Sequence, residues 1–181
     1  QAAARTLDLI YHNTVRSVRR GYANALMGLL ANIVQTLVFI GVFYVLANLL
    51  GMRGMAIRGD YILYLMTGVF TFMTNTKTMG AVAGAEGPAS AMMQHAPMTT
   101  AIAIASAALA ALYTQVLSMV VILGVYHLAV TPLEIHDPIG VAAMVLLAWF
   151  SGGCVGLVVL SMKPWAPGIT GIATSIYTRA N

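Results

Sequence analysis

The sequence predicts an all-α, polytopic helical membrane protein, and three observations lead to this fold class. Hydrophobic residues make up 60% of the 181 residues, charged residues make up 8%, and the mean hydropathy is +0.85. A soluble chain needs a charged exterior, which 5 Asp and Glu residues cannot supply. The apolar runs are continuous and long enough to cross a hydrocarbon core as helices.

Residues 1–21 predict an amphipathic helix that lies in the membrane interface. Apolar side chains share one side of it: Leu7, Ile10, Val15 and Val18. The other side is polar and mostly basic, and we expect Arg16, Arg19 and Arg20 to lie among headgroup phosphates. The alternative is a basic flank that only sets the topology of the chain.

Further apolar runs predict four membrane-spanning helices, followed by the start of a fifth, within a single transmembrane domain. The four runs are 22–50, 61–82, 101–130 and 139–161, and the fifth helix begins within 168–181. At about 1.5 Å per residue the first run is about 43 Å long, so it must tilt or protrude from a core of about 30 Å. The chain opens without Met and its fifth run stops at Asn181, so we expect a trimmed or partial chain.

The distribution of basic residues predicts a cytoplasmic N-terminus. On this topology the residues at or near the inner side are Arg5, Arg16, Arg19, Arg20, Lys77, Lys163 and Arg179, against Arg53 and Arg58 outside. Lys77 is expected to extend to the inner headgroups rather than carry a buried charge. The net charge of +4 therefore indicates anionic lipid and gives no reason to expect nucleic acid as a partner.

Polar and small side chains within the predicted spans point to helix contacts or to a pathway. Amides such as Asn32 and Gln35 either line a pathway or hydrogen-bond one helix to another. A stripe on the second span either lines a wet cavity or bonds back to its own backbone; it consists of Thr67, Thr71, Asn75 and Thr78. Small residues at four-residue spacing predict close helix packing; they are Ala103, Ala107 and Ala111, and Ala148, Gly152 and Gly156.

Motifs of catalysis and cofactor binding are absent from the sequence. It has no G-x-x-x-x-G-K-[ST] phosphate loop, no G-x-S-x-G, no H-E-x-x-H and only one cysteine, Cys154. Glu134, His136 and Asp137 lack the spacing of a metal site. No Asp or Glu lies deep inside a predicted span, which disfavours an ion-coupled carrier. We therefore expect no catalytic residues, no metal and no cofactor, and a membrane component whose energy or chemistry comes from elsewhere.

Four segments taken together resemble the membrane permeases of type-2 ABC exporters, in particular those for capsular polysaccharide, O-antigen and teichoic acid. A basic segment ends in Arg20–Tyr22, and the first span follows with Asn24–Gly28. The second span carries Leu65–Phe70, and Met92–Pro97 precedes an alanine-rich third span. The family has six spans, a proline in the first span and an outer hairpin before the last, and these features are not matched here.

The resemblance implies a transport permease that moves lipid-linked polysaccharide across the bacterial inner membrane. Its partners would be a separate nucleotide-binding ATPase, a second copy of the chain, membrane lipids and the lipid-linked glycan. Residues 84–100 would be the cytoplasmic coupling segment that contacts the ATPase, through Glu86, Met92, Met93, Gln94 and His95. Aromatic and neutral polar groups would line the glycan pathway: Asn32, Gln35, Phe39, Phe43, Phe70, Thr71 and Asn75.

Another function class fits the same composition. A non-catalytic structural subunit of a larger membrane complex would use the Ala and Gly faces to hold its neighbours. The two hypotheses differ at residues 84–100, because only a permease needs that segment to dock an ATPase.

Overall fold

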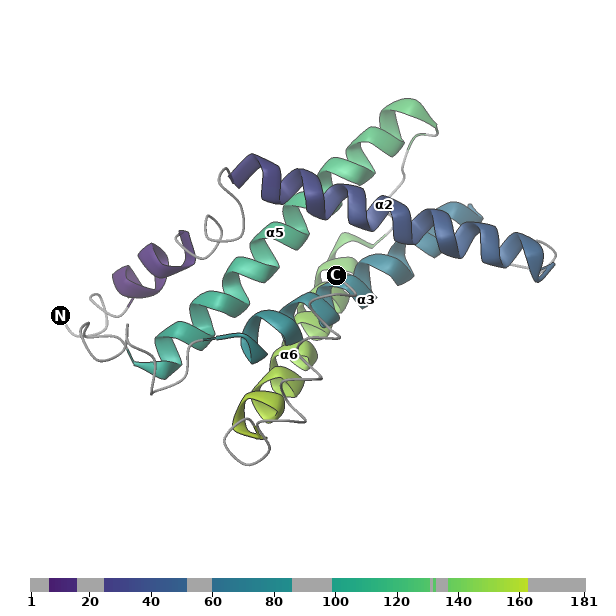
Figure 1. Ribbon diagram of the computed structural model, residues 1–181. Coiled ribbons are helices and arrows are strands. Elements are labelled where there is room, and N and C mark those ends of the chain that lie inside the picture. The colour runs from purple at the N-terminus through teal and green to yellow at the C-terminus, as the bar shows by residue number, and fades with distance from the viewer. Residues whose placement is uncertain are drawn as a thin grey trace.

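The computed structural model describes residues 7–15, 25–51, 60–85, 99–130, 132 and 137–162 of the chain. Within these residues the protein is all-helical, with no strand. A short helix occupies residues 7–15, and the long helices are α2 (Ala25–Leu49), α3 (Tyr61–Ala83), α5 (Thr100–Ala129) and α6 (Pro138–Met162) (Figure 1). The all-α prediction is therefore confirmed for this part of the chain, and the helix ends agree with the predicted runs to within three residues.

Local sequence signals explain where the long helices begin and end. Asp60 caps α3 by accepting a hydrogen bond from the backbone N–H of Ile62, and Thr99 caps α5 in the same way. Pro138 opens α6, where its missing N–H costs nothing. Gly51, just after α2, has φ of 69°, a left-handed conformation that glycine adopts without strain.

Helix α3 lies at the centre of the bundle and contacts α2, α5 and α6. Its most extensive contact is with α6, which runs beside it (Figure 1). The predicted small-residue ridge makes this contact, because Ala148, Gly152 and Gly156 are all buried. A Cβ at Gly156 would lie 2.8 Å from the Met79 carbonyl oxygen, so only glycine allows this approach.

Three of the described helical segments are long and apolar enough to cross a membrane, a property compatible with a membrane protein. They are Met27–Leu49, Thr100–Ala129 and Pro138–Met162. The sequence predicts four such spans, and α3, the second of them, does not reach the same hydropathy. The reason is the polar run Thr74–Thr78, which is largely turned toward neighbouring helices. The predicted fifth helix, within 168–181, lies outside the described residues.

The N-terminal segment is helical over residues 7–15, the part of the predicted helix 1–21 that the structure describes. Asn13 donates a hydrogen bond to the Ser106 hydroxyl at 2.6 Å, which fastens this helix to the N-terminal half of α5. Leu7 and Tyr11 are exposed on its other side. Val18 and the arginines predicted at the membrane interface, Arg16, Arg19 and Arg20, lie outside the described residues.

A side-chain hydrogen bond joins α6 to α5. The Trp149 indole N–H of α6 donates to the Ala108 carbonyl of α5 at 2.8 Å. Ala103, Ala108 and Ala110 are buried, so the alanine-rich half of α5 packs against other parts of the protein. Of the α5 residues predicted at four-residue spacing, only Ala103 is buried, and Ala107 and Ala111 are half-buried.

Candidate functional site

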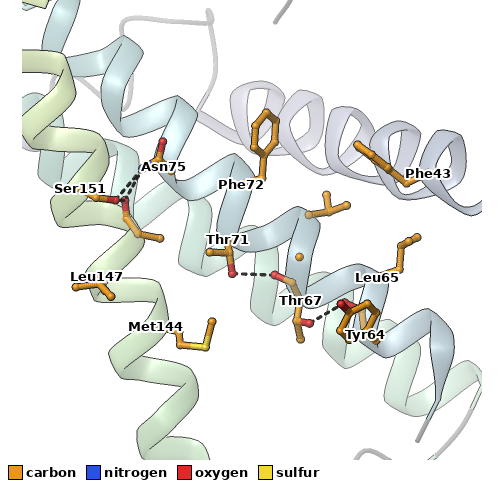
Figure 2. A pocket seen from close by; sticks show the side chains of 13 residues that line it. Phe43, Tyr64, Leu65, Thr67, Thr71, Phe72, Asn75, Met144, Leu147 and Ser151 are labelled. Atoms are coloured by element: carbon orange, nitrogen blue, oxygen red, sulfur yellow. Dashed lines mark hydrogen bonds between the residues drawn. The ribbon is translucent and has the colours of Figure 1, made fainter. Parts of the chain in front are cut away.

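A large open groove of about 1010 Å³ lies between α3 and α6, with one side chain contributed by α2. Its walls are mainly apolar, and Figure 2 shows that its side chains come from three separate parts of the chain. The lining residues are Phe43 of α2, then Tyr64, Leu65, Thr67, Gly68, Val69, Thr71, Phe72 and Asn75 of α3, and Met144, Leu147, Ala148 and Ser151 of α6.

Two threonines form a polar row along the groove. Thr67 donates its hydroxyl hydrogen to the Tyr64 carbonyl, and Thr71 donates to the Thr67 carbonyl, each at 2.8 Å (Figure 2). Thr67 and Thr71 therefore bond to their own backbone and also line a cavity. Thr78, the last residue of the predicted stripe, donates to the Thr74 carbonyl at 2.7 Å, is buried and does not line the groove. A hydroxyl that donates its single hydrogen keeps acceptor capacity on its oxygen.

Asn75 ends this polar row and joins α3 to α6. Its amide nitrogen donates to the Ser151 hydroxyl at 2.8 Å and to the Ala148 carbonyl at 3.3 Å (Figure 2). Both amide hydrogens are thus used, so the carbonyl oxygen is the group that this side chain can offer to a ligand. The groove combines apolar walls with hydrogen-bond acceptors supplied by Thr67, Thr71 and Asn75.

Of the seven residues predicted to line a pathway, three line this groove: Phe43, Thr71 and Asn75. The other four do not. Phe70 is 2% exposed and belongs to the hydrophobic core, since it lies on the opposite side of α3. Phe39 packs beside the groove against the rings of Phe43 and Phe72, each at a centroid distance of 6.4 Å.

Asn32 and Gln35, the remaining two, belong to a polar cluster between helices. Asn32 is buried and donates to the Ser118 hydroxyl at 2.6 Å and to the Gln115 amide oxygen at 3.2 Å. The interpretation that these amides join helices is the one that the structure favours at Asn32.

Lys77 joins the same cluster, which corrects the expectation that its side chain extends to the headgroups. The ammonium group donates to Asn32 Oδ1 and, at 2.6 Å, to Gln35 Oε1. Its position on α3 faces α2 and α5, and two amide oxygens there replace part of the hydration that headgroups would provide.

The predicted coupling residues Glu86, Met92, Met93, Gln94 and His95 lie outside the described residues. The structure does place the two ends of their segment. Gly84 caps α3 at one end by donating its backbone N–H to the Gly80 carbonyl, and Thr99 caps α5 at the other. The segment therefore lies in the chain between the C-terminal end of α3 and the N-terminal end of α5.

The sequence did not indicate the α6 wall of the groove. Met144, Leu147, Ala148 and Ser151 follow the spacing of a single helix face. Because α6 is apolar on all sides, this spacing was not distinguishable from that of its other faces. Ser151 was the one polar residue among these four groove-lining residues of α6, so it was the signal in the sequence that could have indicated this wall.

Comparison of the chain with family models, curated proteins and solved structures found no match. Within the described residues, no group of three or more His, Cys, Asp or Glu side chains is placed to hold a metal ion. The roles of the groove and of the polar cluster are therefore inferred from the chemistry of their own side chains.

Proposed function

We propose that this chain is the transmembrane permease subunit of an ATP-driven exporter that moves a lipid-linked polysaccharide across the bacterial inner membrane. The groove between α3 and α6 is the observation that carries this proposal. Its apolar walls suit a lipid chain, and its polar row offers acceptors to a ligand rich in hydroxyl donors. A sugar linked to a lipid has both properties.

The aromatic residues of the groove support the same substrate class. Tyr64, Phe72 and Phe43 stand along the lining, and aromatic rings pack against the apolar faces of sugars (Figure 2). Phe43 and Phe72 are more than two-fifths exposed, so their rings have free surface for such contact.

The proposal includes an arrangement of the helices in the membrane. Three helices are apolar enough to span a bilayer, and α3, which contacts the other three, is the remaining span of the proposed four. Residues 1–21 then lie in the cytoplasmic interface, with Leu7 and Tyr11 toward lipid. A fifth span follows near the C-terminus, and a second copy of the chain completes the pathway.

In this proposal, ATP hydrolysis by another subunit acts on the permease through residues 84–100. A separate ATPase docks on this segment, and its closure on ATP displaces the ends of α3 and α5. Because α3 packs against α6 and carries most of the groove, its movement changes the shape of the groove.

The alternative of a structural subunit receives less support. That hypothesis uses the Ala and Gly faces to hold neighbouring proteins. Gly152 and Gly156 are instead buried against α3 within the chain itself, so this ridge is not available to a partner.

Co-purification tests the coupling step. The tagged chain is isolated from native membranes in mild detergent, its partners are identified by mass and the material is assayed for ATP hydrolysis. We expect a stoichiometric P-loop ATPase, lost when Glu86, Met92, Met93 and His95 are changed together to alanine. Recovery with another membrane complex and no ATPase would refute the exporter.

Groove variants test the substrate step in the intact exporter. Thr71→Val keeps the side-chain shape and removes the acceptor, and Asn75→Leu removes the amide. We expect both to lower glycan export while ATP hydrolysis continues. Tyr113→Phe is the control, because Tyr113 is exposed on α5 and does not line the groove. Export unchanged in both groove variants would contradict the assignment of the groove.

A further inference from the structure

A polar cluster joins α2, α3 and α5 on the side of α3 away from the groove. It brings together Asn32, Gln35, Lys77, Gln115 and Ser118. Asn32, Gln115 and Ser118 are at least 95% buried. The pattern of donors and acceptors within this cluster determines what it can bind.

The Ser118 hydroxyl sets the orientation of the Asn32 amide. Ser118 donates its only hydrogen to the Thr114 carbonyl at 2.8 Å, so toward Asn32 it can act only as an acceptor. Asn32 must therefore turn its Nδ2 toward Ser118, as observed at 2.6 Å.

Lys77 sets the same orientation independently. An ammonium group has three donors and no acceptor, so Asn32 must present Oδ1 to it. The other hydrogen of Asn32 Nδ2 then goes to Gln115, which must present Oε1, at 3.2 Å. Two separate constraints thus force the Gln115 amide into one orientation.

This orientation leaves a buried donor unsatisfied. Gln115 is 2% exposed, and its Nε2 has no hydrogen-bond partner among the described residues. Turning the amide around would set Nε2 against Asn32 Nδ2, donor against donor. An unpaired buried donor is unfavourable, so the cluster is suited to a ligand that supplies an acceptor beside Gln115.

Lys77 adds a positive charge that no described carboxylate balances. Asp60 lies at the opposite end of α3, about 25 Å away at about 1.5 Å per residue, and is bonded to Tyr126. Asp8 pairs with His12, and Asp137 accepts from the backbone of Gly140 at the start of α6. A cation within a helix bundle favours a bound anion when no carboxylate is near.

We propose that Lys77 and Gln115 bind an oxyanion of the phosphate type between α2, α3 and α5. Lys77 supplies charge and a donor, Gln115 Nε2 supplies a neutral donor, and Asn32 holds both in place. The donors of this site contrast with the acceptors of the groove, so the two sites select different chemical groups. The proposal goes beyond the exporter assignment and does not require it.

Binding to the purified full chain tests the site. The protein is held in dodecyl maltoside micelles, which carry no phosphate, and titrated with inorganic phosphate at constant ionic strength. A second titration uses phosphatidic acid added to the micelles, with diacylglycerol as the phosphate-free match. Binding in the first titration identifies a free anion as the ligand, and binding only in the second identifies a lipid headgroup.

The variants separate this site from the surface arginines. We expect Lys77→Met to raise the dissociation constant about tenfold or more, because a charged hydrogen bond changes affinity by that order. Gln115→Met should raise it severalfold, while Lys77→Arg retains the charge and much of the binding. Tyr113→Phe, exposed two residues from Gln115, should bind as the unchanged protein does.

Equal binding by Lys77→Met and the unchanged chain would overturn the proposal, as would a chain that binds neither inorganic phosphate nor phosphatidic acid. Equal binding by Gln115→Met would also overturn it, since Nε2 would then have no part in the site. If Lys77→Met does not fold, the binding measured for Lys77→Arg and Gln115→Met still tests the site. No ATPase enters this assay, so its failure leaves the exporter to be judged by co-purification.

Discussion

Substituting Gly152 by alanine tests whether backbone contact between α3 and α6 holds the bundle together. A Cβ at this position would lie 3.0 Å from Asn75 Cα and closer still to the Asn75 carbonyl oxygen. These are backbone atoms, which cannot rotate away as a side chain can, so the helices must separate. Overpacking of this kind costs about 1–3 kcal/mol. A separation of about 0.5–1 Å also forfeits a quarter to a half of each dispersion contact.

Gly153 provides a matched control one residue along the same helix. A Cβ there would meet only the Thr78 methyl carbon, at 4.0 Å, which is ordinary contact. Both changes replace glycine by alanine inside α6, and each gains about 1 kcal/mol of helix propensity. The propensity terms cancel in the comparison, so Gly152→Ala should be less stable than Gly153→Ala by about 1–3 kcal/mol.

Equilibrium unfolding in mixed detergent micelles, followed by helical circular dichroism, measures this difference. Gly156→Ala should behave like Gly152→Ala, since its Cβ would lie 2.8 Å from both the Met79 carbonyl oxygen and Val82 Cβ. Equal stabilities for Gly152→Ala and Gly153→Ala would show that α3 and α6 are not in backbone contact. The account of the bundle given above would then be refuted.

Two further predictions concern the cap of α3 and the membrane. Asp60→Ala should destabilise the protein by about 0.5–2 kcal/mol through loss of the helix cap, and it also removes the hydrogen bond that Tyr126 donates to Asp60. Asp60→Asn should retain the cap, because asparagine also caps helices. Equal unfolding midpoints for the two variants would contradict the capping role of Asp60. Cys154 is exposed on α6 and should resist a water-soluble maleimide in vesicles, because the reagent does not enter the hydrocarbon core, and it should react after the membrane is dissolved in detergent. Rapid labelling in intact vesicles would place this part of α6 in water.

Much of the fold could be predicted because the apolar runs determine it locally. A run such as 101–130 has no other way to satisfy its backbone in an apolar environment than to form a helix, and α5 follows it closely. The ends were predictable for a similar reason, since Asp60 and Thr99 are capping residues. The spacing of Ala148, Gly152 and Gly156 also predicted a close helix contact correctly.

The candidate site was predictable only in part. Thr71 and Asn75 share a face of α3, so their spacing placed them together, and both line the groove. Phe70 precedes Thr71 by one residue and turns into the core instead. The hydrophobicity of a phenylalanine does not show whether its ring faces lipid, the core or the groove, because an aromatic ring suits all three environments equally.

The sequence by itself determined that the described part of the chain is helical, where its long helices run and that the small-residue ridge of α6 packs closely. Those properties depend on residues near one another in the chain. Only the tertiary structure decided which helix α6 packs against and that Lys77 turns toward Asn32 and Gln35. It also decided that the Gln115 amide nitrogen has no hydrogen-bond partner among the described residues. Each of these depends on groups 40 or more residues apart, and their relative positions follow from helix packing rather than from any local pattern.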